Sequence, residues 1–344
     1  MYKTSRRLSL AKKIVFIDGL EGCGKTLFST VISSLDRVEK LTYAYELEMF
    51  CSLYHINKIE KDAVLTLTRM LTDLVTYDSM MSREVNFRPT DLSSIFKSPF
   101  YFKYLKRMFL KGDAAVPDRI DKENPITALT VHKLLINALP IFESLQDRVR
   151  YVEIVRHPLY MLIQQTINNE ILIYTPRDFT IYIEYKDTEI PWYAIGWEEI
   201  FLNAKPIDKT IYYIYELNKL MNKNKDEINT KYPNQLITIP FEKFVLDPMP
   251  FMQEISNLIS SKIVKETIKC LKNQNVPRTK IADGIPLEVY KRCGWVPSNE
   301  NMTEKEELNL RREYAIKQGV SDKALALLDE MSLEYENKYM KGIL

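Results

Sequence analysis

The chain has 344 residues, of which 46% are hydrophobic and 27% are charged, so it is long enough to bury one large core. Its formal net charge of +2 argues against a broad basic surface for nucleic acid. The most apolar stretch, residues 126–142, is interrupted by His132, Lys133 and Asn137, and a membrane helix needs roughly 18 uninterrupted apolar residues. These features predict a protein that binds neither nucleic acid nor a membrane.

The cysteines and the N-terminal segment indicate a reducing compartment. No two of the cysteines form a C-x-x-C pair; they are Cys23, Cys51, Cys270 and Cys293. The basic residues 1–13 run directly into a short apolar run and then into a glycine-rich motif, so cleavage of a signal peptide would remove that motif. We therefore expect a cytoplasmic protein.

The glycine-rich motif is GLEGCGKT, residues 19–26, directly after the apolar run 14–17. It fits the pattern G-x-x-x-x-G-K-[ST], in which backbone N–H groups surround a phosphate, a lysine neutralises it and a hydroxyl lies beside it. A helix that begins near Lys25 adds the positive end of its dipole. The motif predicts a phosphate-binding loop made by Gly22, Cys23, Gly24, Lys25, Thr26 and Leu27.

Hydrophobic periodicity predicts the other elements. Apolar runs predict core strands over residues 14–17, 150–155 and 234–240, and a hairpin over 180–195. Apolar residues at three-and-four spacing predict helices over 27–35, 47–74, 127–145 (broken at Pro140), 159–173, 207–222 and 250–258, with loops and short helices over 88–113. Strands that alternate with helices indicate an α/β fold with three layers, in which helices flank a mainly parallel sheet.

The C-terminal part is predicted to be a helical tail. Thr303 and Glu306 form a capping-box pattern, and Gly319 separates two helical stretches. We expect a P-loop domain over residues 1–300 and a helical extension over 301–344. The extension either packs on the domain as a solvated helical pair, which we favour, or mediates self-association into a homo-oligomer.

Three later segments place chemistry at the ends of predicted strands, where ligands gather in open α/β sheets. Arg156, in the sequence VRHP, follows the strand at 150–155 and can reach a bound phosphate. The segment PFEKFVLDP, residues 240–248, follows the next strand. The loop NVPRTKIADG, residues 275–284, supplies Arg278 and Lys280.

In this order, the motifs resemble the sulfotransferase family of P-loop proteins, which transfer a sulfuryl group from 3′-phosphoadenosine 5′-phosphosulfate (PAPS) to a hydroxyl or amine. The resemblance spans most of the chain. It implies that the loop holds the 5′-phosphosulfate, and that Arg156, at the family's R-[DNH]-P arginine, holds the 3′-phosphate. Gln164 stands where the family usually has a serine, and Arg278 and Lys280 resemble the late R-K-G loop. Glu242 matches a structural glutamate of the family.

The resemblance also implies a general base, because the family commonly has a histidine ahead of this arginine. Thr130-Val131-His132 lies 24 residues before Arg156, close to that arrangement, and the other histidines, His55 and His157, fit less well. A group that titrates near neutrality suits proton transfer from an acceptor hydroxyl. The alternative is a packed histidine on an apolar helix, and both interpretations stay open.

The loop departs from the family, because Gly22 stands where the usual K-[ST]-G-[TS]-T loop has its lysine. Lys25 and Thr26 instead give the form of a nucleotide kinase, so the alternative function is an ATP-dependent kinase or NTPase that uses Mg²⁺. That chemistry needs an acidic residue at a strand end, and Asp18, Glu153 and Glu242 fit this role poorly. We favour PAPS, without a metal, since a triphosphate would not require a second phosphate site.

Two further hypotheses concern partners. Aromatic residues near the predicted hairpin are either core packing, which we favour, or the wall of an acceptor site; they are Tyr185, Trp192, Tyr193 and Trp197. A non-catalytic protein that uses the fold for binding or assembly is the third class of function. The sequence does not identify the acceptor.

Overall fold

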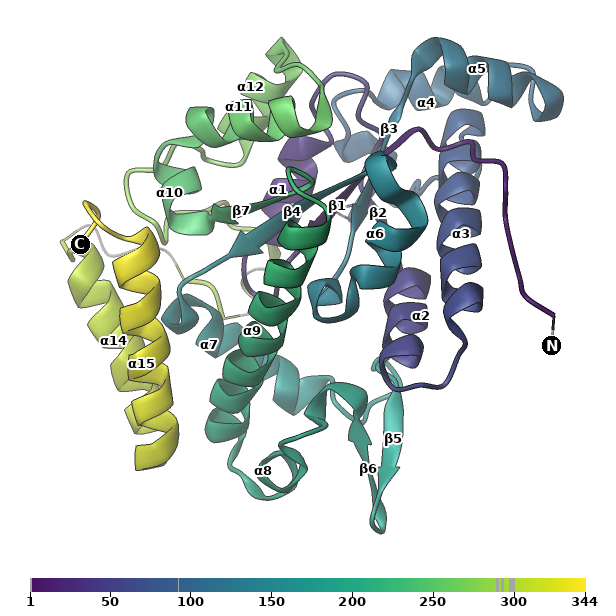
Figure 1. Ribbon diagram of the computed structural model, residues 1–344. Coiled ribbons are helices and arrows are strands. Elements are labelled where there is room, and N and C mark those ends of the chain that lie inside the picture. Colours follow the sequence, from purple (N-terminus) through teal and green to yellow (C-terminus); the bar gives the residue numbers. More distant parts are fainter. Residues whose placement is uncertain (1, 92, 289–290, 292–293, 297–300) are drawn as a thin grey trace.

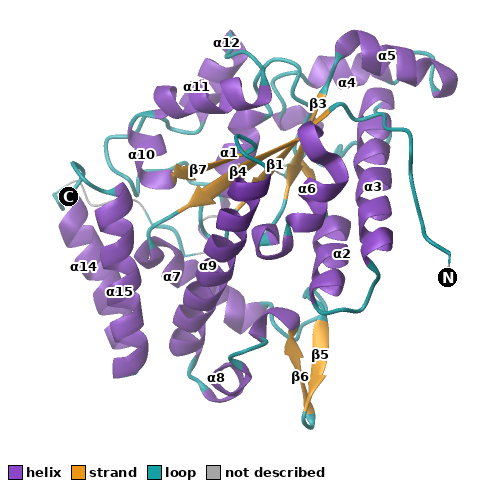
Figure 2. Ribbon diagram, in the orientation of Figure 1, coloured by secondary structure: helices purple, strands orange, loops and turns teal. Residues whose placement is uncertain are grey.

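The structure, a computed structural model, describes residues 2–91, 93–288, 291, 294–296 and 301–344 (Figure 1). At its centre is a five-stranded sheet in the order β2-β3-β1-β4-β7, in which every neighbouring pair is parallel (Figure 2). These strands are β1 (Lys13–Asp18), β2 (Thr42–Tyr43), β3 (Ile126–Thr130), β4 (Val149–Val155) and β7 (Leu236–Pro240). The separate hairpin predicted from the sequence is β5 (Tyr182–Tyr185) and β6 (Thr188–Pro191).

Helices surround the sheet (Figure 2). They are α1 (Lys25–Ile32), α2 (Tyr45–His55), α3 (Lys61–Met81), α4 (Tyr101–Arg107), α5 (Val116–Glu123), α6 (Leu139–Leu145), α7 (Pro158–Ile171), α8 (Glu198–Asn203), α9 (Pro206–Lys231), α10 (Phe241–Leu246), α11 (Pro248–Ile259), α12 (Lys265–Asn273), α14 (Glu304–Lys317) and α15 (Asp322–Tyr339). Short 3-10 helices are η1 (Ile95–Lys97), η2 (Asp113–Ala115), η3 (Leu134–Asn137), η4 (Gln146–Arg148) and η5 (Trp192–Ala194). No helix within these described stretches is long and apolar enough to cross a membrane.

Side chains that alternate along β4 show that the sheet is the middle of three layers. On one face, Arg150 Nε donates to the carbonyl of Leu258 in α11, at 3.0 Å. On the other face, Glu153 accepts from Lys225 Nζ of α9, at 2.9 Å. Helices α1, α11 and α12 therefore cover one face and α6 and α9 the other, which confirms the predicted α/β fold.

The helix predicted over residues 127–145 is wrong in its first part. Residues 126–130 form strand β3, η3 follows, and Pro140 lies in the first turn of α6 instead of breaking a helix. All five residues of β3 are buried, because β1 and β2 flank the strand and helices cover its faces. A strand buried on both faces is continuously apolar, and so is a buried helix, so periodicity does not separate them.

The C-terminal helices α14 and α15, yellow in Figure 1, pack against α7 and α9. Their buried residues belong to the same hydrophobic core as the sheet; these include Leu308, Ala315, Ala324 and Leu328. The capping box is confirmed, because Glu306 N–H donates to Thr303 Oγ1 and Thr303 N–H donates to Glu306 Oε2. The tail therefore packs on the domain, and the division at residue 300 stays a prediction.

A buried hydrogen bond connects α15 to the end of the sheet. The hydroxyl of Tyr335 donates to Glu242 Oε2 at 2.5 Å and lies 3.2 Å from the carbonyl oxygen of Val155. The other carboxylate oxygen, Oε1, accepts from the N–H of His157 at 3.0 Å. Glu242 is fully buried, and burial raises its pKa. Its carboxyl group therefore depends on these donors.

We expect Tyr335→Phe to lower the free energy of unfolding by about 1–3 kcal/mol, because a buried carboxyl would lose a hydrogen-bond donor. Urea unfolding followed by circular dichroism measures this change. Tyr339→Phe is the matched control: its ring centroid lies 4.9 Å from that of Tyr335, and its hydroxyl makes no hydrogen bond within the described residues. Equal losses in the two variants would contradict the role of the Tyr335 hydroxyl.

Candidate functional site

The phosphate loop lies between β1 and α1 and needs glycine at specific positions. Gly24 has a φ of +100°, and a Cβ there would lie 2.4 Å from the ring of Phe241. Gly19 has a φ of +149°, and a Cβ there would lie 2.4 Å from the carbonyl oxygen of Ile154. Side chains at these positions would be both strained and crowded. The loop is thus shaped by its contacts with the end of β4 and with the first residue after β7.

The lysine of the loop is held by the loop itself. Lys25 is only 6% exposed, and its Nζ donates to the carbonyl oxygens of Gly19 at 2.6 Å and Leu20 at 2.9 Å. Cys23 is buried, and its N–H donates to the carbonyl of Leu20 at 3.2 Å. Burial raises the pKa of the Cys23 thiol, so it stays protonated.

A cavity of about 220 Å³ opens beside this loop, and we call it the loop cavity. Four adjacent strands supply its walls, because the loop follows β1, His132 follows β3, Arg156 follows β4 and Phe241 follows β7. This is the position at which open parallel sheets bind ligands. The residues predicted from the sequence that line it are Gly22, Gly24, Lys25, Thr26, Leu27, His132, Arg156, Gln164 and Arg278.

Two predicted residues do not line the loop cavity. Cys23 instead lines a separate hollow, between the loop and α15. The Nζ of Lys280 donates to the carbonyl of Met302 at 2.7 Å, so this lysine connects the basic loop to the tail. Arg278 remains in the cavity wall, where its Nη1 donates to the carbonyl of Ile281 at 2.9 Å.

Three arginines alternate with two aromatic rings in the wall of the loop cavity. The guanidinium of Arg156 lies 4.2 Å from the ring centroid of Phe241 and 5.2 Å from that of Tyr160. Arg278 lies on Phe241 at 5.4 Å, and Arg311 lies on Tyr160 at 4.3 Å. We call this row the arginine–ring stack. Cation–π contacts offset part of the repulsion between the arginines.

Arg156 connects the stack to the phosphate loop. Its Nη1 donates to the carbonyl of Gly22 at 2.8 Å, and its Nε is buried with no hydrogen-bond partner among the described atoms. Burial lowers the pKa of Arg156, although the nearby carboxyl of Glu242 opposes this. An anion bound in the cavity would therefore stabilise this half-buried guanidinium.

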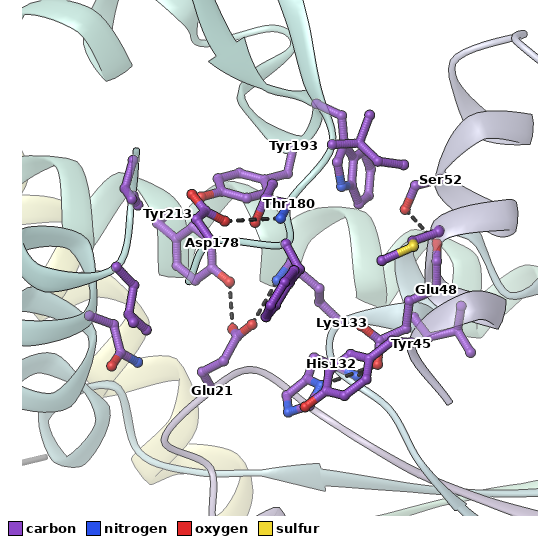
Figure 3. A pocket seen from close by; sticks show the side chains of 18 of the residues that line it. Glu21, Tyr45, Glu48, Ser52, His132, Lys133, Asp178, Thr180, Tyr193 and Tyr213 are labelled. Carbon is purple, nitrogen blue, oxygen red and sulfur yellow. Dashed lines mark hydrogen bonds and ion pairs between the residues drawn. The ribbon is translucent and has the colours of Figure 1, made fainter. Parts of the chain in front are cut away.

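His132 lies on the loop after β3, not on a helix, and Glu48 of α2 holds it. The backbone N–H of His132 donates to Glu48 Oε1 at 2.9 Å, and its Nδ1 lies 3.1 Å from the same oxygen (Figure 3). The imidazole is stacked nearly parallel to the rings of Tyr43 and Tyr45, with centroids 6.1 and 5.9 Å away. A proton on Nδ1 donates to Glu48, which leaves Nε2 as a proton acceptor.

A third cavity, of about 290 Å³, also has His132 in its wall, and we call it the polar cavity. Glu21 lies in its wall and accepts from Lys133 Nζ at 2.6 Å and from Tyr213 at 2.5 Å (Figure 3). Burial alone would raise the pKa of Glu21, but Lys133 and Lys25 hold it well below its usual value. His132 and Glu21 line both cavities, so the two cavities meet at these side chains.

The aromatic residues near the hairpin divide into two groups. Trp192 and Tyr193 line the polar cavity. Trp197 packs on Phe201, and its Nε1 donates to the carbonyl of Tyr193 at 2.9 Å. Tyr185 donates to Glu199 at the surface. Of the four aromatic residues, Trp192 and Tyr193 are therefore the ones placed to line an acceptor site.

The acidic residues close to the loop are engaged by protein groups. Asp18 Oδ2 accepts from the N–H of Leu135 at 2.7 Å and from Tyr151 at 2.6 Å. Burial raises the pKa of Asp18. Glu153 is paired with Lys225 of α9, which packs on its face of the sheet. Among the described residues, no group of three His, Cys, Asp or Glu side chains is arranged to hold a metal ion.

Sequence reasoning missed several residues of this site. Glu48 is 84 positions from His132, and Arg311 belongs to the tail, so no local motif indicates either. Tyr160 and Trp295 also line the loop cavity. Phe241 precedes Glu242 in the segment PFEKF, and the family resemblance implies a role for Glu242 alone.

No family model matches the chain, and no curated protein matches it. Its structure is similar to solved sulfotransferases. Mouse sulfotransferase SULT7A1 complexed with PAP matches at 11% identity and a TM-score of 0.37, over 93% of this chain and 89% of that one. Sulfotransferase STF9 from Mycobacterium avium matches at 11% and 0.43, over 96% and 78%. The sulfotransferase domain from the Synechococcus PCC 7002 olefin synthase matches at 10% and 0.37, over 93% and 99%. At these values, the similarity concerns the fold alone.

His157, next to Arg156, is a buried neutral histidine. The N–H of Leu159 donates to its Nδ1 at 3.2 Å, and its Nε2 lies 3.2 Å from Glu336 Oε1 of α15. Burial, followed by the charges of Arg311 and Arg156, lowers the pKa of His157 to about 3. Protonation of Nδ1 would place two donors against each other, so the fold requires the neutral ring.

We expect the free energy of unfolding to fall by about 2 kcal/mol between pH 7 and pH 5 because of His157. In this range the unfolded chain binds a proton on this histidine and the folded chain does not, so acid favours unfolding. His157→Asn keeps an oxygen that can accept from Leu159 but does not titrate, so its stability should fall less. Urea unfolding at pH 7, 6 and 5 measures both slopes. Identical slopes would show that His157 does not cause the loss.

Proposed function

We propose that the protein is a sulfotransferase that transfers a sulfuryl group from PAPS to a hydroxyl or amine. The observation that carries this proposal is the position of His132. Held by Glu48, it lies between a cavity lined by the phosphate loop and arginines and a second, polar cavity. This arrangement suits a donor on one side of a base and an acceptor on the other.

The loop cavity has separate groups for two anions. Lys25, Thr26 and the loop N–H groups would hold the 5′-phosphosulfate. Arg156 and Arg278 would hold the 3′-phosphate, and Gln164, whose Oε1 lies beside Gly22, contributes an amide. Lys280 is not assigned a ligand role, because it does not line the loop cavity, whereas Lys25 does and has a third N–H beyond its bonds to Gly19 and Leu20.

The reaction follows from these positions. His132 Nε2 takes the proton of the acceptor, whose oxygen or nitrogen forms a bond to sulfur. The bond between sulfur and the bridging oxygen of the 5′-phosphate breaks, and its electron pair stays on that oxygen, so 3′,5′-adenosine bisphosphate (PAP) leaves. Lys25 neutralises the charge that develops there. Glu48 stabilises the imidazolium that forms on His132.

The sequence GKT favours a second candidate, an ATP-dependent kinase or NTPase with Mg²⁺ held by Thr26. Such enzymes place an acidic residue at the end of a strand beside the loop. Here β3 ends in Thr130 and leads to His132, while β4 leads to Arg156. The Oδ1 of Asp18 is buried without a hydrogen-bond partner among the described atoms, but its Oδ2 accepts from Tyr151, and Glu21 within the loop accepts from Lys133. These engagements favour the sulfotransferase.

Isothermal titration of the wild-type protein with PAP tests the donor site. We expect binding, and a dissociation constant about tenfold to a hundredfold higher in Arg156→Ala, because a charge-assisted hydrogen bond to the ligand is lost. Arg150→Ala, which removes an arginine from the other end of β4, should leave PAP affinity unchanged. Absence of PAP binding, together with magnesium-dependent ATP turnover that Lys25→Ala abolishes, would favour the kinase instead.

Kinetic variants test the base. With labelled PAPS and a panel of phenols, sugars and amines as acceptors, we expect His132→Ala to lower kcat about 10²- to 10⁴-fold while PAP affinity stays unchanged. Glu48→Gln should lower kcat less, because the ring keeps a hydrogen-bond partner without the charge. Glu46→Gln, on an exposed position of the same helix, is the control. Wild-type turnover in His132→Ala would exclude this histidine as the base.

A further inference from the structure

The arginine–ring stack contains one arginine that comes from outside the P-loop domain predicted from the sequence. Arg156 and Arg278 follow β4 and α12, whereas Arg311 belongs to α14 of the C-terminal extension. All three line the loop cavity. We propose that Arg311 is a third cationic ligand for the second anionic group of the nucleotide, which is the 3′-phosphate if the donor is PAPS. This inference rests on the proposed function and extends it to the tail.

The geometry of Arg311 suits a ligand contact. Its side chain is only 14% exposed. Its Nε and Nη2 donate to Glu307 Oε1, at 2.9 and 2.7 Å, which fixes one edge of the guanidinium. Its Nη1 makes no hydrogen bond to the described part of the chain, and the face of the group lies on Tyr160. A guanidinium fixed in this way loses little side-chain entropy when it binds an anion.

The start of α14 holds this arginine in place. Glu304 Oε2 accepts from the hydroxyl of Tyr160 at 3.0 Å, and Glu304 Oε1 accepts from the N–H of Ile281 at 2.9 Å. One carboxylate thus connects α14 to α7 and to the basic loop that carries Arg278. Arg311 follows Glu304 by seven residues, so both lie on the same face of the helix. The tail is therefore built into the wall of the loop cavity.

The next residue along α14 has a different role. Arg312 points to α15, where its Nε and Nη2 form a two-point ion pair with Asp329, both at 2.6 Å. It does not line the loop cavity. The roles of Arg311 and Arg312 can therefore be tested separately, because Arg311 faces the cavity and Arg312 joins the tail helices.

The stack also implies a preference among nucleotides. A nucleoside diphosphate carries its charge in one group, which the phosphate loop can hold alone. A nucleotide with a second, separate phosphate adds a charge that the three guanidinium groups can bind. Arg311 should therefore strengthen the binding of PAP more than that of ADP.

Isothermal titration with PAP and with ADP tests this inference on the full-length chain. We expect Arg311→Ala to raise the dissociation constant for PAP about tenfold to a hundredfold, with a change below about threefold for ADP. Arg312→Ala should stay within about threefold of wild type for PAP. Glu307→Gln breaks the same ion pair but keeps the guanidinium, so it should also keep most of the affinity. Arg311→Lys keeps the charge and should fall between wild type and Arg311→Ala.

The outcomes separate this inference from the proposed function. If the wild-type protein does not bind PAP, the proposed donor and this role of Arg311 are both wrong. If the wild type binds PAP and Arg311→Ala binds it equally well, only the role of Arg311 is wrong. Equal losses in Arg311→Ala and Glu307→Gln would show that the ion pair matters only for the structure. Equal losses for PAP and ADP would contradict a contact with the second phosphate.

Discussion

The guanidinium of Arg156 is the interaction on which the rest of the site depends. It bonds to the phosphate loop through Gly22 and lies on the rings of Phe241 and Tyr160. A half-buried cation also needs compensation, and the buried carboxyl of Glu242 provides part of it. That carboxyl is in turn held by His157 N–H and Tyr335. The charge of one arginine therefore organises the ends of β4 and β7 and the packing of α15.

The second organising constraint is the order of the parallel strands. Because β3, β1, β4 and β7 are neighbours, their carboxyl ends bring His132, the phosphate loop, Arg156 and Phe241 to one edge. The polar cavity extends from this edge toward the hairpin, and His132 lies where it meets the loop cavity. The order of the strands thus places two cavities next to each other, with His132 and Glu21 in the wall of both.

The parts of the fold and site that short sequence patterns determine could be predicted. The strand, loop and helix around residues 14–32 follow from a motif whose glycines have steric reasons, and Arg156 follows from its place after an apolar strand. Strand β3 was mistaken for a helix because it is buried on both faces. Glu48 and Arg311 were missed because tertiary packing alone brings them to the site, from helices far away in the sequence. Lys280 was expected to hold the 3′-phosphate, but its ammonium donates to the carbonyl of Met302 in the tail, and the residue does not line the loop cavity.

The contacts of the last two helices bear on how a newly synthesised chain acquires its site. Domains generally form as the chain emerges, N-terminal segments first. The phosphate loop and Arg156 emerge first, and Glu304, Arg311 and Tyr335, which hold or extend the arginine–ring stack, emerge well after them. A ribosome-bound chain that lacks residues 301–344 would have the loop without these supports. The wall of the loop cavity is thus completed only after the C-terminal helices have emerged and packed on the domain.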